Sequence, residues 1–87
     1  MKYFAALSIM RDPKKSQDLR AQHLEFLGQM EKEGKIFARG RFADGAGGLI
    51  IYKAESFEDA RKIAESDPYV TSGARGLELH EWEMKLS

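Results

Sequence analysis

The chain contains no cysteine, only two prolines and two histidines, and no long apolar run. Without cysteine there is no disulfide framework, no thiolate metal site and no cysteine nucleophile. Two histidines cannot build a histidine-rich zinc site alone, so we expect no metal and no cofactor. The uncharged run from Tyr3 to Met10 is far too short to span a membrane. No small-residue cleavage site follows it, so we expect a cytoplasmic protein without a membrane partner.

Net charge is also absent, because 14 basic residues balance 14 acidic ones. This balance argues against a protein that binds nucleic acid by neutralising phosphates. The length of 87 residues is below the ~100–200 residues typical of one domain. We therefore expect one domain over residues 1–87. A lone monomer of this size buries little surface and is only marginally stable.

Apolar periodicity and end signals predict six elements. Ser16 is the expected N-cap of the first helix, and Gly34 ends that helix. Ser56 and Asp59 approximate a capping box, and Pro68 ends the second helix. The expected strands are residues 2–10, 35–43, 48–54 and 76–86, and the expected helices are residues 16–33 and 56–66, with a loop at 69–75. A change of apolar phase near residues 80–81 suggests a bulge in the last strand.

The order β-α-β-β-α-β predicts an α+β, ferredoxin-like fold with a four-stranded antiparallel sheet. Strands 2–10 and 48–54 are apolar on both faces and belong in the centre, whereas the charged strands belong at the edges. Two helices cover only one face of such a sheet. We therefore expect a homodimer in which two sheets pack face to face.

His23 and Asp67 are the strongest candidates for chemistry. His23 falls inside the apolar stripe of the first helix, and Asp67 follows the second helix on the same side of the sheet. An aspartate that accepts from one imidazole nitrogen leaves the other nitrogen free as a base. The structural alternatives are a core histidine bonded to a backbone carbonyl and an ordinary Asp-Pro turn.

Other side chains are candidates for binding a substrate. Arg20, Arg39 and Arg41 are able to hold an anionic group, and Tyr69 is able to hydrogen-bond a ligand. The alternatives are a solvated surface for Arg20, edge protection or pairing with last-strand glutamates for Arg39 and Arg41, and a partly buried loop ring for Tyr69. For His80 we expect a structural role.

Three segments of the chain together resemble the YciI-like (YCII-related) family. They are Arg20–Leu27 (RAQHLEFL), Gly34–Gly40 (GKIFARG) and Ser66–Gly73 (SDPYVTSG), and the likeness extends over essentially the whole chain. The resemblance implies a dimeric ferredoxin-like fold with a His–Asp active site, carried here by His23 and Asp67. The family includes a dehydrochlorinase that acts on a chlorinated hydroxyhydroquinone, and its fold relatives include muconolactone isomerase. Arg41 is a departure, because the family often has proline after the glycine at position 40.

These observations favour a homodimeric, cofactor-independent acid–base enzyme of the isomerase or HX-eliminating lyase type. Its expected substrate is a small cyclic or aromatic, anionic metabolite, with His23 and Asp67 catalytic and Arg20, Arg41 and Tyr69 binding the substrate. The alternative is a non-catalytic dimeric module that binds a small molecule. A ferredoxin-like RNA binder is disfavoured, because residues 47–54 lack the stacking aromatic pair of that class.

Overall fold

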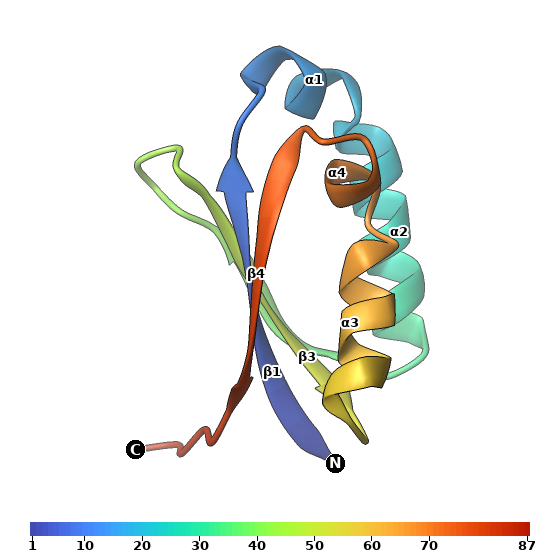
Figure 1. The fold of residues 1–87 in the computed structure, drawn as a ribbon, viewed down its shortest axis with the longest axis vertical. Coiled ribbons are helices and arrows are strands. Elements are labelled where there is room, and N and C mark those ends of the chain that lie inside the picture. The colour runs from blue at the N-terminus through green and yellow to red at the C-terminus, as the bar shows by residue number, and fades with distance from the viewer.

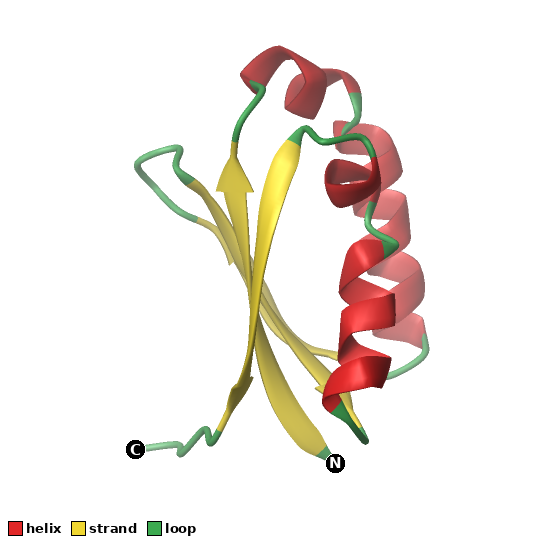
Figure 2. Cartoon of the chain, viewed as in Figure 1, coloured by secondary structure: helices red, strands yellow, loops and turns green.

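The computed structural model covers residues 1–87 and consists of a sheet with helices on one face (Figures 1 and 2). The strands are β1 (Lys2–Met10), β2 (Ile36–Arg41), β3 (Gly47–Ala54) and β4 (Arg75–Trp82), and the helices are α1 (Pro13–Asp18), α2 (Arg20–Lys32), α3 (Phe57–Glu65) and α4 (Pro68–Thr71). The sheet is antiparallel with the order β2-β3-β1-β4. The ferredoxin-like prediction is confirmed, with β1 and β3 central. None of the helices is long and apolar enough to cross a bilayer.

The first helical region begins earlier than predicted and is divided in two. Asp12, not Ser16, is the N-cap: its side chain accepts a hydrogen bond from the amide of Lys15 at 3.0 Å, and Pro13 occupies the first turn. Proline is favoured there because its missing N–H has no helical partner. At Leu19 the backbone (φ −97°, ψ 2°) leaves the helical region and separates α1 from α2. Ser16 instead lies buried inside α1.

The second half of the chain departs from prediction in three places. Residues 69–75 are not all loop, because an Asp-Pro signal like that of α1 starts α4 at Pro68. The last strand ends at Trp82 rather than at residue 86. The expected bulge in it is wrong: β4 pairs with β1 in continuous register, and the sheet's irregularity lies in β2 between Ile36 and Ala38. The apolar pattern of the sequence changes phase because Leu77 and Leu79 of β4 face the helices, whereas Trp82 lies on the opposite face of the sheet.

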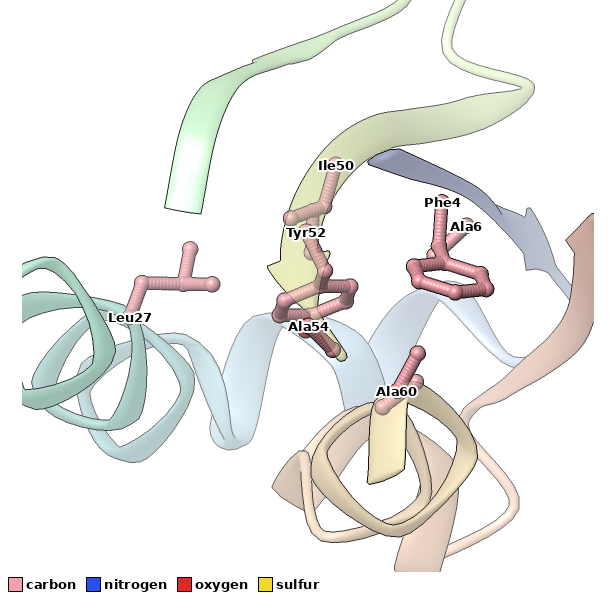
Figure 3. Close-up of a cluster of buried hydrophobic side chains, with 8 residues drawn as sticks. Phe4, Ala6, Leu27, Ile50, Tyr52, Ala54 and Ala60 are labelled. Atoms are coloured by element: carbon pink, nitrogen blue, oxygen red, sulfur yellow. The ribbon is translucent and has the colours of Figure 1, made fainter. Parts of the chain in front are cut away.

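The core lies between the sheet and the helices (Figure 3). Phe4 on β1 and Tyr52 on β3 are the largest fully buried side chains. Leu27 reaches them from α2, whereas α3 contributes the small residues Ala60 and Ala64. Small side chains let a helix backbone approach the sheet closely, so α3 and the adjoining α4 are held against it.

No element of the chain covers the other face of the sheet (Figure 2). By strand pairing this face carries Tyr3 from β1, Ile51 from β3 and Trp82 from β4. Phe37 joins them through an edge-on contact with Tyr3, with ring centroids 5.2 Å apart. Phe37 and Trp82 are 42% and 44% exposed. This apolar face is the basis of the homodimer, which stays a prediction.

Candidate active site

Asp67 is buried at the junction between α3 and α4, where its side chain caps α4. Its Oδ1 accepts a hydrogen bond from the amide of Tyr69 at 2.9 Å, and the residue is only 2% exposed. Asp67 follows the C-terminal end of α3, where the negative end of the helix dipole disfavours a carboxylate. The start of α4 supplies a backbone donor that offsets this disadvantage.

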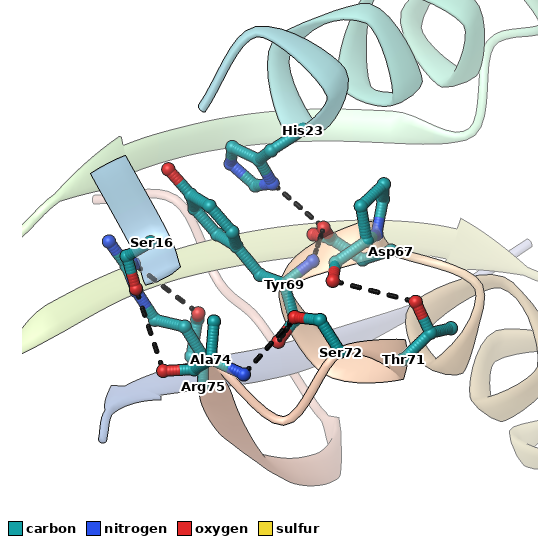
Figure 4. Close-up of polar contacts among 10 residues, drawn as sticks. Ser16, His23, Asp67, Tyr69, Thr71, Ser72, Ala74 and Arg75 are labelled. Atoms are coloured by element: carbon teal, nitrogen blue, oxygen red, sulfur yellow. Dashed lines mark hydrogen bonds and ion pairs between the residues drawn. The ribbon is translucent and has the colours of Figure 1, made fainter. Parts of the chain in front are cut away.

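His23 points inward from α2 and meets Asp67 (Figure 4). Its Nδ1 lies 2.8 Å from Oδ1 of Asp67, and the two side chains are 12% and 3% exposed. An ionised carboxylate only accepts hydrogen bonds, so a neutral His23 carries its proton on Nδ1 and donates it to Asp67. The other ring nitrogen, Nε2, is then unprotonated and available as a base.

Tyr69 lies between His23 and Arg75 (Figure 4). Its ring stacks on the imidazole with centroids 3.9 Å apart and planes inclined by 13°. The guanidinium of Arg75 lies over the same ring, 4.3 Å from its centroid. Arg75 also donates to the hydroxyls of Ser16 and Ser8, at 3.3 and 3.4 Å. These contacts hold Arg75, Tyr69 and His23 in one stack, because each member packs against the next.

His23 forms part of the wall of a cavity of about 280 Å³ between α2, α4 and the sheet. Its charged lining is entirely basic: Arg20, Arg39, Arg41 and Arg75 contribute to it, and no aspartate or glutamate does. Arg39 pairs with Glu31 of α2 at 3.1 Å, whereas the other three have no carboxylate within ion-pair distance. A cavity lined by one sign of charge attracts ligands of the opposite sign.

The floor of the cavity is made of small residues, Gly47 and Gly48 of β3 and Ser8 of β1. Gly47 has φ of 141°, and a Cβ built there would lie 1.8 Å from the carbonyl oxygen of Ser8. A Cβ on Gly48 would lie 2.8 Å from the carbonyl oxygen of Gly40. Larger residues therefore do not fit at either position, and Ser8 contributes the only side chain of this floor.

The predicted site residues gather around this cavity. His23, Arg20, Arg41 and Tyr69 line it, and Asp67 lies behind His23. Tyr69 is not a partly buried loop ring but a buried residue of α4, 2% exposed.

Arg39 does not pair with glutamates of β4, because β2 and β4 are opposite edges of the sheet. His80 is exposed, with Nε2 3.1 Å from Glu78, and lies outside the cavity on the uncovered face.

Sequence reasoning missed Arg75. The segment before residue 76 was predicted as loop, so no face of the sheet was assigned to Arg75. The structure begins β4 at Arg75 and pairs this residue with Met10 of β1. The available signal was Ser8 in an otherwise apolar strand, since a buried hydroxyl needs a polar partner.

Tyr52 of β3 is a buried ionisable group in the core near Asp67. Burial raises the pKa of the Tyr52 phenol well above its usual range, and the negative charge of Asp67 raises it further. Tyr52 therefore stays a neutral phenol across the ordinary pH range. No group of three or more His, Asp or Glu side chains is arranged to hold a metal ion.

The fold and this site together define a ferredoxin-like α+β protein with a buried His–Asp pair beside a basic cavity. The YCII-related domain family matches residues 1–83, so the chain belongs to that family. An uncharacterized protein of Bacillus subtilis (strain 168), YjpA, is 36% identical over 83 residues, which is 95% of this chain and 98% of that protein.

A solved structure shares the fold of the chain. It is 5-chloro-2-hydroxyhydroquinone dehydrochlorinase from Burkholderia phenoliruptrix AC1100 in complex with 2,5-dihydroxybenzoquinone. The TM-score is 0.80, the sequence identity is 22%, and the match covers 95% of each chain. At this identity the likeness establishes the architecture, and the chemistry must be argued from the residues of this chain.

Proposed function

We propose that this protein is an acid–base enzyme in which His23 moves a proton on a small anionic cyclic substrate. The observation that carries the proposal is the 2.8 Å contact between His23 Nδ1 and Asp67 Oδ1 at the wall of a basic cavity. The contact holds the ring in one orientation and leaves Nε2 for the ligand. His23 is the general base, and Asp67 orients it and stabilises the imidazolium that forms.

Elimination and isomerisation are the two reaction classes that suit this pair. In elimination, a substrate O–H or C–H proton passes to Nε2. The electrons of the broken bond form a new π bond, and the leaving group X⁻ departs with its own bonding pair. In isomerisation, the imidazolium returns the proton to a different carbon of the same substrate. The substrate loses HX in the first case and keeps all its atoms in the second.

Two further observations support the proposal. The arginines around the cavity favour a substrate that is anionic or becomes so when its proton leaves. The structural neighbour is named as a dehydrochlorinase, and such an enzyme removes HCl from its substrate. For this chain, the roles of Arg20, Arg41 and Tyr69 are to bind and position the substrate beside His23.

The experiment is a turnover assay on a panel of hydroxylated and halogenated cyclic acids and quinols. Absorbance spectra report isomerisation or quinone formation, and halide release reports elimination. We expect at least one compound to be turned over by the wild-type protein. His23→Gln should lower the rate by ~10²–10⁴-fold, because general acid–base catalysis contributes about that much. His80→Gln, which changes the other histidine, should leave the rate unchanged.

A non-catalytic binding module would use the same cavity and would bind compounds of the panel without turning them over. Calorimetry measures the binding of each compound, and the turnover assay then distinguishes the binding module from the enzyme. Binding by the wild-type protein with no turnover of any bound compound would contradict the enzyme proposal.

A further inference from the structure

The positive charge of Arg75 lines the cavity and has no carboxylate of the protein within ion-pair distance. Its Nε and Nη1 donate to the hydroxyls of Ser16 and Ser8, which are neutral, and its guanidinium face rests on Tyr69. A guanidinium has five N–H donors, so further donors remain after these two contacts. Arg75 lines the cavity, and its orientation is already fixed. It is therefore preorganised to bind an acidic group of a ligand.

Arg41 approaches the same cavity from the opposite edge of the sheet. It ends β2 and pairs with Gly48 of β3, which in turn pairs with Ser8 of β1. Arg75 begins β4 and pairs with Met10, two residues beyond Ser8 on the same face of β1. The two arginines thus flank the small-residue floor from either side.

The space between them suits a flat ring. Hydrogen atoms replace side chains at Gly47 and Gly48, so the small hydroxymethyl group of Ser8 is the one side chain of the floor between the two arginines. A volume of about 280 Å³ is just below the usual range for ligand cavities, ~300–1,000 Å³, so the ligand must be small. His23 contributes to the wall from α2, on the side opposite the sheet.

The positive charges that line the cavity favour a ligand with more than one anionic group. Arg20, Arg41 and Arg75 lack acidic partners, and the single carboxylate nearby, Asp67, is engaged by His23. A ligand with one acidic group would leave one of the two flanking charges unpaired when the cavity loses its water. In the free protein Arg75 is half-buried and Arg41 is exposed to water, and a ligand seated between them would exclude water from both, so each charge gains from an acidic partner.

We propose that the cavity binds cyclic compounds with acidic groups at opposite ends of the ring, one held by Arg41 and the other by Arg75. This inference rests on the proposed function, since it defines the substrate class that His23 would act on. Arg75 is then a specificity-determining residue. Its binding role is measured with inert ligands, separately from any proton transfer.

The test is calorimetric titration with benzoate, benzene-1,2-dicarboxylate and benzene-1,4-dicarboxylate. The 1,4-isomer should bind at least ~tenfold more tightly than benzoate, because its second carboxylate gains a charge-assisted contact. The 1,2-isomer should show little of this gain, since its carboxylates point to one side. Arg75→Gln and Arg41→Gln should each remove the preference for the 1,4-isomer. Benzoate affinity should change at most about twofold, because one arginine remains to bind it.

Two variants make the outcome specific. Arg61→Gln, which changes an arginine of α3 outside the cavity, should keep the preference. The titrated ligands are not substrates, so a failed turnover assay leaves this test intact. Arg75→Lys should recover part of the preference, because it restores the charge without the fork of donors.

Two results would overturn the inference. The first is equal affinity of the wild-type protein for benzoate and the 1,4-isomer, including no binding of either. The second is a preference that survives Arg75→Gln. If that variant does not fold, Arg41→Gln decides alone, and an unchanged preference in it counts against the inference.

Discussion

His23 Nδ1 and Asp67 Oδ1 lie 2.8 Å apart although 44 positions separate the two residues in the chain. The same carboxylate oxygen also accepts the amide of Tyr69 at 2.9 Å. Oδ1 of Asp67 therefore has two roles, because it caps the start of α4 after the Asp-Pro signal and also accepts a hydrogen bond from His23. The cap of α4 holds the oxygen in place for the imidazole.

This double role predicts different costs for two substitutions of Asp67. Asp67→Asn keeps an oxygen that caps α4, whereas Asp67→Ala leaves the Tyr69 amide and His23 Nδ1 without an acceptor. We expect Asp67→Ala to lower the free energy of unfolding by ~1–2 kcal/mol more than Asp67→Asn does. Urea denaturation of the three proteins measures this difference. Equal stability of the two variants would show that the cap contributes nothing.

Tyr52 predicts how stability changes in alkali. The Tyr52 phenol has an ordinary pKa of 10.0, and burial raises it in the folded state. The stabilising effect of the neutral buried phenol is fully present below pH 10 and is lost as the pH rises toward the folded pKa. Above pH ~10 the ionisation of Tyr52 should lower the free energy of unfolding by up to ~1.4 kcal/mol per pH unit.

The measurement is the free energy of unfolding of the wild-type protein and Tyr52→Phe between pH 8 and 12. The wild-type curve should fall relative to the variant above pH 10, since phenylalanine has no proton to lose. Curves that stay parallel over this range would contradict the account of Tyr52.

Arg39 should matter little to stability. Its ion pair with Glu31 is part-exposed, with the two side chains 35% and 44% accessible. Such pairs contribute ~0.2–1 kcal/mol, so Arg39→Ala should cost less than about 1 kcal/mol. Thermal or urea unfolding of the variant checks this value. A much larger loss would mean that Arg39 supports the fold in a way that its edge position does not explain.

The uncovered face of the sheet predicts a homodimer in solution. Sedimentation equilibrium should give about twice the chain mass of 9.9 kDa at micromolar concentration. Trp82→Lys, on the uncovered face, should shift the equilibrium toward monomer.

Phe57→Lys is the matched control, because Phe57 is 43% exposed but belongs to α3. It should leave the association unchanged. A single monomeric species of wild-type protein at these concentrations would rule out the dimer.

Much of the fold could be predicted from the sequence, because strong local signals agreed with the apolar pattern. Ser56 caps α3 through the amide of Asp59, and Gly34 follows α2 with φ of 73°, as expected. The errors occurred where two signals competed. Asp12-Pro13 and Asp67-Pro68 each start a short helix, whereas the sequence pattern predicted the first helix only from Ser16 and took Pro68 only as the end of the second helix.

The candidate site was less accessible to sequence reasoning. The inward phase of His23 on its helix predicted its side of the sheet. The expected topology allowed His23 to meet Asp67, and the resemblance to the YCII-related family implied that the two form a site. Arg75 did not emerge, because its role depends on the register of β4 against β1 and on the buried hydroxyls of Ser8 and Ser16. Such tertiary contacts leave no periodic signal in one sequence.

The central claim is that Asp67 fixes the tautomer of His23 and leaves Nε2 as the base. Long-range ¹H–¹⁵N NMR of the imidazoles at pH ~9, where an ordinary histidine is neutral, tests it directly. His80→Gln identifies the His23 signals. We predict a protonated Nδ1 and an unprotonated Nε2 in the wild-type protein. In Asp67→Ala the acceptor of Nδ1 is lost, so the proton should no longer be held on Nδ1 and should move toward Nε2. A wild-type His23 protonated on Nε2, or an unchanged tautomer in Asp67→Ala, would contradict the account.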